Sequence, residues 1–259
     1  MNYYIIKLDT IFKKGYPKML KILFSPSENK RAGGEEEKRE IFGSNSAREE
    51  ILKSYNEIIC SKNEEKIKNL FGLKKISDVA AYINDIFDSK QMCAIERYCG
   101  VAYEYLDFNS LKDSAKEFAK TNTIIFSNLY GPVFGGDLIA NYKVKQGNSI
   151  GEIAPEKFYS DRFSYQLDLY LNGCDILDLR AGYYDKFYKI KKPHTTLKFL
   201  KDGKVVSHWA KAYRGLVLRA VSQNSITSIA DFMRLEIENL SVREIVKKAN
   251  NTEIIYEIS

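Results

Sequence analysis

A short apolar run that stops at a proline constrains the fold of this chain more than any other feature of its sequence. Residues 18–24 read KMLKILF, a pattern typical of a buried strand, and Ser25-Pro26 follows directly. Proline lacks the N–H group that strand pairing needs, so the strand is expected to end there. The polar stretch SENKRAGGEEEKRE that comes next is typical of a loop. Similar apolar runs at 123–126 (TIIF) and 174–179 (CDILDL) predict two more strands.

Helical patterns lie between these strands. Over 46–60, apolar residues recur at spacings of three and four, which predicts one face of an amphipathic helix. Further helices are predicted over 64–71, 77–88, 110–120 (with Ser110 as the N-cap), 155–171, 210–221 and 227–240, with helix and loop over 92–106. Additional strands are predicted over 142–145, in a hairpin over 197–209, and at a sheet edge over 253–258.

Because helices and strands interleave without a regular strand–helix–strand series, we expect an α/β (mixed α+β) fold. It is a single compact domain with a mixed sheet and a helical insertion at about residues 46–120. The 259 residues and the 44% hydrophobic content suffice for one substantial core. Residues 1–18 are interpreted as an N-terminal extension, with Met19 as an alternative start, and residues 19–259 as the domain.

The cysteines and histidines favour a reduced protein without a metal site. None of the four cysteines forms a C-x-x-C pair, and there are only two histidines, so no zinc site is expected. No apolar run reaches 18 residues, and the one at the N-terminus is broken by Lys7 and Asp9. We therefore expect a cytoplasmic protein with no membrane span, no metal and no cofactor.

Positive charge is concentrated in one part of the chain. Residues 186–219 contain ten lysines and arginines but a single acid, Asp202, an excess of nine that is larger than the net charge of +6 of the whole chain. One interpretation is a solvated lysine-rich face. The other is a surface that binds an anionic partner.

The first polar cluster follows the strand at 18–24, at the kind of place where α/β sheets present ligand groups. Ser27 and Glu28 are able to donate or accept a hydrogen bond or a proton, and Glu28 is the candidate base. Lys30 and Arg31 are able to hold an anion. An ordinary charged surface loop is the alternative.

The second cluster lies in a glycine-rich stretch, LYGPVFGGDLIANYK (129–143), that ends with Tyr142 and Lys143. Glycines permit a close approach of the backbone to a ligand, and they equally permit a plain turn. The stretch contains neither G-K-[ST] nor G-x-G-x-x-G, so it is neither a P-loop nor a dinucleotide-binding fingerprint.

The third and fourth clusters add arginines. Asp178 and Arg180 are expected on one side of a strand, either as a structural ion pair or as the edge of an anion site, with Tyr183 close behind. Lys211 and Arg214 share a helix face at a spacing of three. His208 stands at the helix start, where a phosphate is favoured, or is an ordinary core histidine. The neighbouring Trp209 is expected in the core or as a stacking wall.

At these four clusters the chain resembles the YaaA family of bacterial cytosolic peroxide-stress proteins. The pieces that carry the resemblance are SPSENKRAGG (25–34), NLYGPVFGGDLIANYKVKQG (128–147), ILDLRAGYYDKF (176–187) and VSHWAKAYRGLVLRA (206–220). The resemblance implies a compact α/β fold with a positively charged cleft, DNA binding, and a lowering of free intracellular iron during hydrogen-peroxide stress. The family's recurring polar residues correspond to Ser27, Glu28, Lys30, Tyr142, Lys143, Arg180, Tyr183, Lys211 and Arg214.

The resemblance also implies a helix-hairpin-helix that grips the DNA backbone. Its candidate here is LFGLKKISDVAAYI (70–83), with Gly72 at the turn and Lys74 and Lys75 suited to phosphate contacts. A single glycine stands where such turns usually have two, so a plain helical hairpin is the alternative.

Two functions therefore stay open at this stage. The first is a stress protein that binds DNA non-specifically through a basic cleft. The second is an enzyme that acts on a small anionic or nucleotide-like substrate in the same cleft. Direct iron storage is not favoured because no ligand cluster is visible. The expected anion- or DNA-binding residues are Ser27, Lys30, Arg31, Tyr142, Lys143, Arg180, Tyr183, His208, Lys211 and Arg214.

Overall fold

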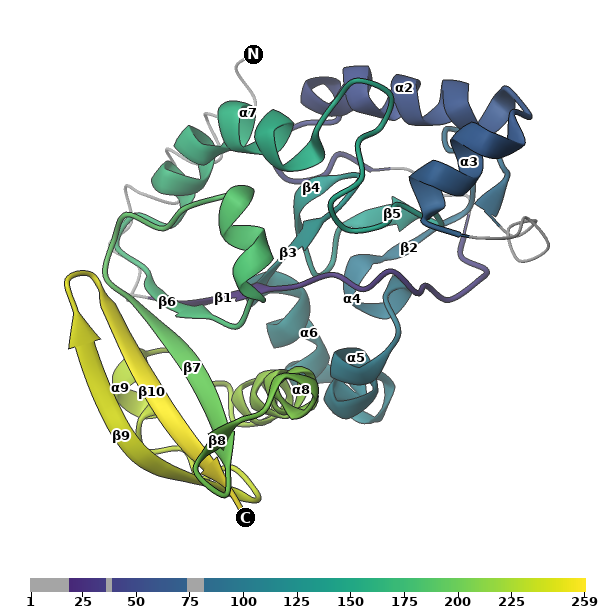
Figure 1. Cartoon of the computed structure of the whole chain (residues 1–259). Helices are drawn as coiled ribbons and strands as arrows, with labels where there is room; N and C mark the ends of the chain where they lie inside the picture. Colours follow the sequence, from purple (N-terminus) through teal and green to yellow (C-terminus); the bar gives the residue numbers. More distant parts are fainter. Residues whose placement is uncertain (1–18, 36–38, 74–81) are drawn as a thin grey trace.

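A computed structural model describes residues 19–35, 39–73 and 82–259 of the chain (Figure 1). It has a mixed α/β architecture built on an eight-stranded sheet with strand order β4-β3-β1-β6-β7-β10-β9, and β8 pairs with β7. The strands of this sheet are β1 (Leu20–Phe24), β3 (Thr123–Ser127), β4 (Gly131–Phe134), β6 (Asp175–Asp178), β7 (His194–Lys201), β8 (Lys204–Val205), β9 (Leu240–Lys248) and β10 (Asn251–Ile258). A second small sheet pairs β2 (Gln91–Cys93) with β5 (Leu138–Ala140).

Strand β1 lies in the middle of the large sheet and is buried along its whole length. It runs parallel to β3 on one side and to β6 on the other. Strands buried on both faces have nearly continuous apolar sequences, which is why this strand and its two neighbours were predicted. Because the three strands are parallel, their carboxyl ends meet at one edge of the sheet, and this edge positions the candidate site.

Helices cover both faces of the central strands (Figure 1). On one face, Tyr103 of α5 packs edge-on against Phe24 of β1, and on the other Lys21 of β1 lies near the ring of Tyr170 in α7. The helices are α2 (Glu49–Cys60), α3 (Glu64–Phe71), α4 (Ala94–Arg97), α5 (Val101–Leu106), α6 (Asp113–Asn122), α7 (Pro155–Tyr170), α8 (Ser207–Gln223) and α9 (Ile229–Phe232), with 3-10 turns η1 (Ser46–Arg48), η4 (Phe108–Ser110) and η5 (Gly182–Lys186).

The close approach of α5 and α8 requires a glycine. A side chain at Gly215 of α8 would place its Cβ 2.0 Å from the carbonyl oxygen of Ala102 in α5. The missing side chain lets α8 lie directly against α5, under the carboxyl end of β1.

Several sequence predictions are wrong in the C-terminal part. The helix predicted over 227–240 is reduced to α9, and the chain then enters strand β9. Strand β10 is not at the sheet edge, because β9 pairs with its outer side. Strand β9 carries Arg243, Glu244, Lys247 and Lys248. It is exposed over most of its length, so it lacks the apolar alternation by which a strand is recognised.

Other predicted boundaries also differ. Trp209 belongs to α8 rather than to a hairpin strand, and it is exposed rather than in the core. Helix α6 begins after Lys112 and not after Ser110. Of the helix predicted over 77–88, the described residues 82–88 contain no α-helix, and residues 86–88 form a turn.

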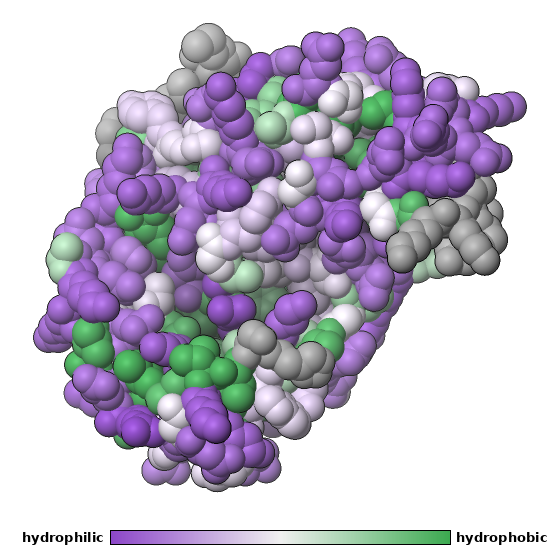
Figure 2. All heavy atoms as spheres, in the orientation of Figure 1, coloured by the Kyte–Doolittle hydropathy of each residue, from purple (hydrophilic) through white to green (hydrophobic). Residues whose placement is uncertain are grey.

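Apolar side chains gather over the β7-β10-β9 part of the sheet, at the lower left of Figure 2, whereas the face around α2 and α3 is hydrophilic. The exposed apolar residues of this outer part include Val205, Val242 and Ile245. No helix in the described part of the chain is long and apolar enough to cross a membrane.

Candidate functional site

The candidate site is built at the sheet edge where β1, β3 and β6 end. We call the residues Glu28, Lys30, Tyr142, Lys143 and Gln146 the polar edge. The first two belong to the loop after β1, and the other three to the extended segment after β5. The two segments are far apart in sequence, and the following contacts bring them together.

Lys30 is buried at this edge, and no carboxylate of the described residues forms an ion pair with its amine. Its Nζ donates hydrogen bonds to the carbonyl oxygens of Ser27 (3.1 Å) and Glu28 (3.2 Å) and lies 3.9 Å from the ring centre of Tyr142. Burial lowers the pKa of Lys30 well below the usual lysine value, and the charge of Lys143 lowers it further, against the opposing effect of the Glu28 carboxylate. An amine that is both desolvated and beside another cation is typical of functional sites.

Glu28 connects the two segments of the polar edge. Its Oε1 accepts a hydrogen bond from the backbone N–H of Gln146 at 3.1 Å, while the side chain stays exposed. Lys143 is half-buried, and its backbone N–H donates to the hydroxyl of Tyr55 in α2 at 3.2 Å. A carboxylate and two amines are therefore held within one small region of the surface.

A chain of hydroxyl groups lies beneath the polar edge. Ser127 Oγ accepts hydrogen bonds from the N–H groups of Leu129 (3.2 Å) and Tyr130 (2.8 Å), so its own hydrogen is donated to the hydroxyl of Tyr142, 2.7 Å away. The hydroxyls of Tyr142 and Tyr98 are 2.8 Å apart and share one hydrogen bond. The other phenolic hydrogen of this pair has no further acceptor within the described ranges.

Burial keeps these phenols protonated, because it raises the pKa of Tyr142 to about 12 and also raises that of Tyr98. Tyr183 is half-buried nearby on η5, and burial together with the Glu156 carboxylate raises its pKa to about 12. Its neighbour Tyr184 donates to Asn128 Oδ1 at 3.2 Å. These tyrosines act as hydrogen-bond donors at neutral pH rather than as bases.

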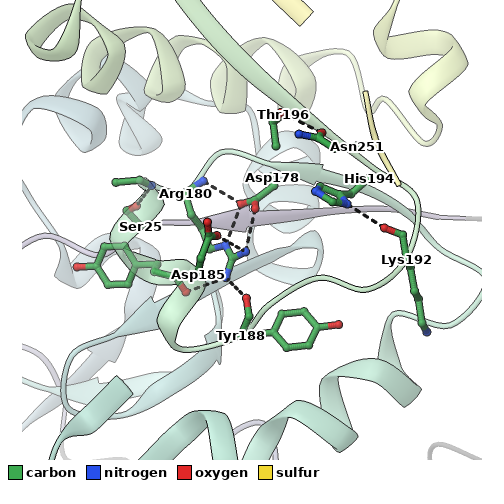
Figure 3. Close-up of polar contacts among 11 residues, drawn as sticks. Ser25, Asp178, Arg180, Asp185, Tyr188, Lys192, His194, Thr196 and Asn251 are labelled. Atoms are coloured by element: carbon green, nitrogen blue, oxygen red, sulfur yellow. Dashed lines mark hydrogen bonds and ion pairs between the residues drawn. The ribbon is translucent and has the colours of Figure 1, made fainter. Parts of the chain in front are cut away.

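Arg180 is fully engaged by the protein itself (Figure 3). Its Nε and Nη2 each donate to one oxygen of Asp178 at 2.8 Å, and Nη2 also reaches Asp185 at 3.3 Å. Its Nη1 donates to the carbonyl oxygens of Tyr184 (3.1 Å) and Tyr188 (2.9 Å). All five N–H groups of this guanidinium have acceptors, so the geometry favours the structural ion pair among the two alternatives from the sequence.

Helix α8 brings Arg214 to the same end of the sheet. Arg214 is half-buried; burial lowers its pKa and the charge of Asp178 raises it. Lys211, one turn earlier, is exposed. For His208, the structure describes the backbone in the first turn of α8 but not the side chain.

The remaining predicted residues lie apart from the polar edge or outside the described residues. Arg31 is exposed and lines a cavity of about 550 Å³ beside β2 and β5. Gly72 ends α3 with φ of 65°, and its missing side chain leaves room for Lys145 of the segment after β5. Lys74 and Lys75 lie outside the described residues, and so does the rest of the predicted hairpin turn. The predicted extension 1–18 also lies outside them.

Some residues of the site are not among those singled out from the sequence. Ser127, Asn128 and Gln146 contribute a hydroxyl, an amide and a backbone N–H. Asn128 and Gln146 lie within the stretch 128–147 that carries the family resemblance, but their residue types do not reveal these contacts. Tyr98 belongs to a chain with 18 tyrosines, so its role is not visible without the fold. No group of three or more His, Cys, Asp and Glu side chains within the described residues is arranged to hold a metal ion.

The sequence of this chain matches a family model and several bacterial proteins. A family model described as peroxide stress protein YaaA matches residues 20–245. A protein of Campylobacter jejuni is 42% identical over 247 residues, which cover 92% of this chain and 99% of that protein.

Two more distant relatives carry the name UPF0246 protein. The one from Fusobacterium nucleatum is 24% identical over 240 residues, covering 90% of this chain and 97% of its own. The one from Streptomyces coelicolor is 30% identical over 213 residues, which cover 77% of this chain and 82% of that protein. The family match extends from β1 into β9, so it includes every segment that contributes to the polar edge.

Proposed function

This chain belongs to the peroxide stress protein YaaA family, and from that membership we propose that it limits free intracellular iron and damage to DNA and protein during hydrogen-peroxide stress. We place this activity in the cytoplasm and propose that it includes non-specific binding of DNA. The observation that supports DNA binding is the exposure of the cationic segment 186–219. Six of its ten basic side chains are exposed, namely Lys186, Lys189, Lys191, Lys201, Lys204 and Lys211.

Exposed lysines suit a partner whose charge repeats along a backbone. Each lysine presents a mobile point charge, which binds a phosphate without reading a base. Binding of this kind releases counterions from the DNA, so affinity falls as salt rises. DNA held in this way is indifferent to sequence, as a protective role requires.

The binding test is a titration of the protein with a short duplex at several salt concentrations. Six phosphate contacts would give a slope of about −5 in a plot of log affinity against log salt. Lys186→Gln/Lys189→Gln/Lys191→Gln should weaken binding and flatten that slope. The matched control replaces three exposed lysines on the α2–α3 side, Lys53, Lys62 and Lys66. Equal effects of the two triple variants, or an affinity independent of salt, would contradict DNA binding through this segment.

The cellular test is a measurement of free iron by electron paramagnetic resonance in whole cells exposed to hydrogen peroxide. Deletion of the gene should raise the iron signal, and the wild-type gene should restore it. Restoration by the Lys186/Lys189/Lys191 variant would separate iron limitation from DNA binding. An unchanged signal in the deletion strain would contradict the proposed role.

The polar edge favours a second candidate, an enzyme acting on a small anionic or nucleotide-like substrate. Non-specific DNA binding needs only positive charge, whereas Lys30 is desolvated and Glu28 is held beside it by Gln146. Glu28 is the base of this candidate reaction, and Lys143 balances charge on the substrate.

A thermal-shift screen with nucleotides and sugar phosphates tests this candidate, since a ligand that binds only the folded state raises the unfolding temperature. Glu28→Gln should preserve the fold and remove turnover of any substrate found. A Glu28→Gln protein that restores every cellular phenotype of the deletion strain would count against the enzyme.

A further inference from the structure

In the described part of the chain, the buried arginines are satisfied by oxygen atoms of the protein itself, whereas the half-buried Arg214 is not. Arg48 donates to the carbonyl oxygens of Tyr130 (2.6 Å), Ser44 (2.7 Å) and Pro132 (2.7 Å). Arg97 and Arg180 are likewise surrounded by carbonyl or carboxylate oxygens.

The contrast is sharpest within helix α8. Arg219 donates to the carbonyl oxygens of Leu106 and Asp107, each at 2.9 Å. Arg214 lies five residues earlier on the same helix and is also partly buried. Its guanidinium has no hydrogen-bond acceptor or ion-pair partner among the residues whose side chains the structure describes.

The Asp178 carboxylate, whose charge acts on Arg214, is already occupied. The negative charge of Asp178 stabilises the protonated Arg214 without a hydrogen bond to it. One Asp178 oxygen accepts from Arg180 Nε and from the Arg180 backbone N–H, and the other accepts from Arg180 Nη2. A partly buried guanidinium that lacks an acceptor costs free energy, because its N–H groups lose water without gaining a partner. Proteins retain such an unfavourable arrangement where the group binds a ligand.

Arg214 also lies at a place in the fold where side chains commonly bind ligands. The next residue, Gly215, lies against Ala102 of α5, and the adjacent Tyr103 donates its hydroxyl hydrogen to the carbonyl oxygen of Ser25 at 2.9 Å. Ser25 Oγ accepts from the backbone N–H of Ala181 at 2.8 Å, which joins the loops after β1 and β6. Arg214 therefore stands where two parallel strands end, the usual place for a ligand in an open α/β sheet.

We infer that the guanidinium of Arg214 binds the oxyanion of a small ligand, a phosphate monoester or a carboxylate, at the carboxyl ends of β1 and β6. The planar fork of a guanidinium donates two parallel hydrogen bonds to either group, and partial burial strengthens them. This inference rests on the small-substrate role proposed above. The lysines of the polar edge are point charges and contribute attraction without this geometry.

The test compares Arg214→Met, Arg214→Lys and Arg219→Met by thermal unfolding and calorimetry. The probes are inorganic phosphate, adenosine monophosphate, malonate and a short DNA duplex, each at matched ionic strength. The Arg214→Met protein without ligand should unfold at the wild-type temperature or above it, because a partly buried unpaired charge is removed. It should lose at least tenfold in affinity for the small anion that stabilises the wild type, and Arg214→Lys should lose an intermediate amount.

Arg219→Met is the control for a structural arginine. It should unfold at a lower temperature and keep the wild-type response to the anion. Phosphate and malonate distinguish the two kinds of oxyanion. A response to the duplex alone would overturn the inference in favour of backbone binding.

Two further outcomes would also overturn it, and they differ in what they leave standing. If Arg214→Met keeps the wild-type affinity for the small anion, another group binds the oxyanion and the small-substrate role survives. If no small anion stabilises the wild type, the small-substrate role falls together with the inference.

Discussion

The Glu28 carboxylate accepts a hydrogen bond from the backbone N–H of Gln146 at 3.1 Å, although 118 residues separate the two in sequence. This contact ties the loop after β1 to the segment after β5. Glutamine at position 28 keeps an oxygen acceptor and removes the charge, so Glu28→Gln should change the free energy of unfolding by less than about 0.5 kcal/mol. Glu28→Ala should instead accelerate hydrogen exchange of the Gln146 amide, measured by mass spectrometry. Equal exchange in the two variants would mean that this hydrogen bond does not hold the segment.

Lys30 should make stability depend on pH. Burial lowers its pKa in the folded state, so between that lowered pKa and the usual lysine value of about 10.4 the unfolded chain binds a proton that the folded chain does not. The contribution of Lys30 to stability is therefore greatest above the usual value and is lost as pH falls through the lowered one. Within that window the slope is about 1.4 kcal/mol per pH unit.

Lys30→Met should remove this contribution of Lys30 to the pH dependence of stability. Urea unfolding of the variant and the wild type at several pH values measures the difference. The variant should gain stability relative to the wild type as pH is lowered. Lys53→Met replaces an exposed lysine on α2 and should give a difference that does not vary with pH over the same range. If the difference in the free energy of unfolding between Lys30→Met and the wild type did not vary with pH, the pKa of Lys30 would not be lowered by burial.

The segment 142–145 shows what sequence periodicity reveals and what it does not. Tyr142 and Val144 are buried while the lysines beside them are more exposed, so the alternation that predicts a strand is real. The segment nevertheless pairs with no strand in the part of the chain that the structure describes. The backbone N–H groups of Lys143 and Lys145 donate to Tyr55 of α2 and to Leu70 of α3 instead. Periodicity reports which side chains are buried, and the hydrogen-bond partners depend on segments far away in sequence.

The same distinction applies to the candidate site. Lys30 and Arg180 are conspicuous in the sequence because they are charged residues beside buried strands, and Lys143 because it ends the glycine-rich stretch 129–143. Their differences were not predictable, since Arg180 is saturated by acceptors that include the carbonyl oxygen of Tyr188. Residue type alone does not distinguish a structural arginine from one that is available to a ligand.

Arg180 should be indispensable to the fold. Lys has three N–H donors on a single nitrogen, so it cannot reproduce the five hydrogen bonds that Arg180 makes from three nitrogens, and the buried Asp178 carboxylate would be poorly paired. Arg180→Lys should lower the free energy of unfolding by about 3–5 kcal/mol, measured by urea denaturation. The control is Arg162→Lys, which alters an exposed pair with Glu50 and should cost less than about 1 kcal/mol. Similar losses in the two variants would contradict the structural role of Arg180.

The hydroxyl chain at Ser127 predicts an asymmetry between two tyrosines that touch. Tyr142 accepts the hydrogen of Ser127 and shares one hydrogen bond with Tyr98, which leaves a single phenolic hydrogen without an acceptor among the described residues. In Tyr98→Phe, one hydroxyl hydrogen still lacks an acceptor, so the number of unsatisfied groups does not rise. In Tyr142→Phe, both Ser127 and Tyr98 lose their partner, and the number rises to two.

Leaving a buried donor unsatisfied costs about 1–3 kcal/mol, more than the net contribution of an intact hydrogen bond. Tyr142→Phe should therefore lower the free energy of unfolding by at least about 1 kcal/mol more than Tyr98→Phe, measured in parallel urea titrations. Both substitutions remove one oxygen atom from a buried ring, so the loss of packing is matched between them. If Tyr98→Phe were the more damaging change, Tyr98 would have a further partner, and the hydrogen assigned to it would point elsewhere.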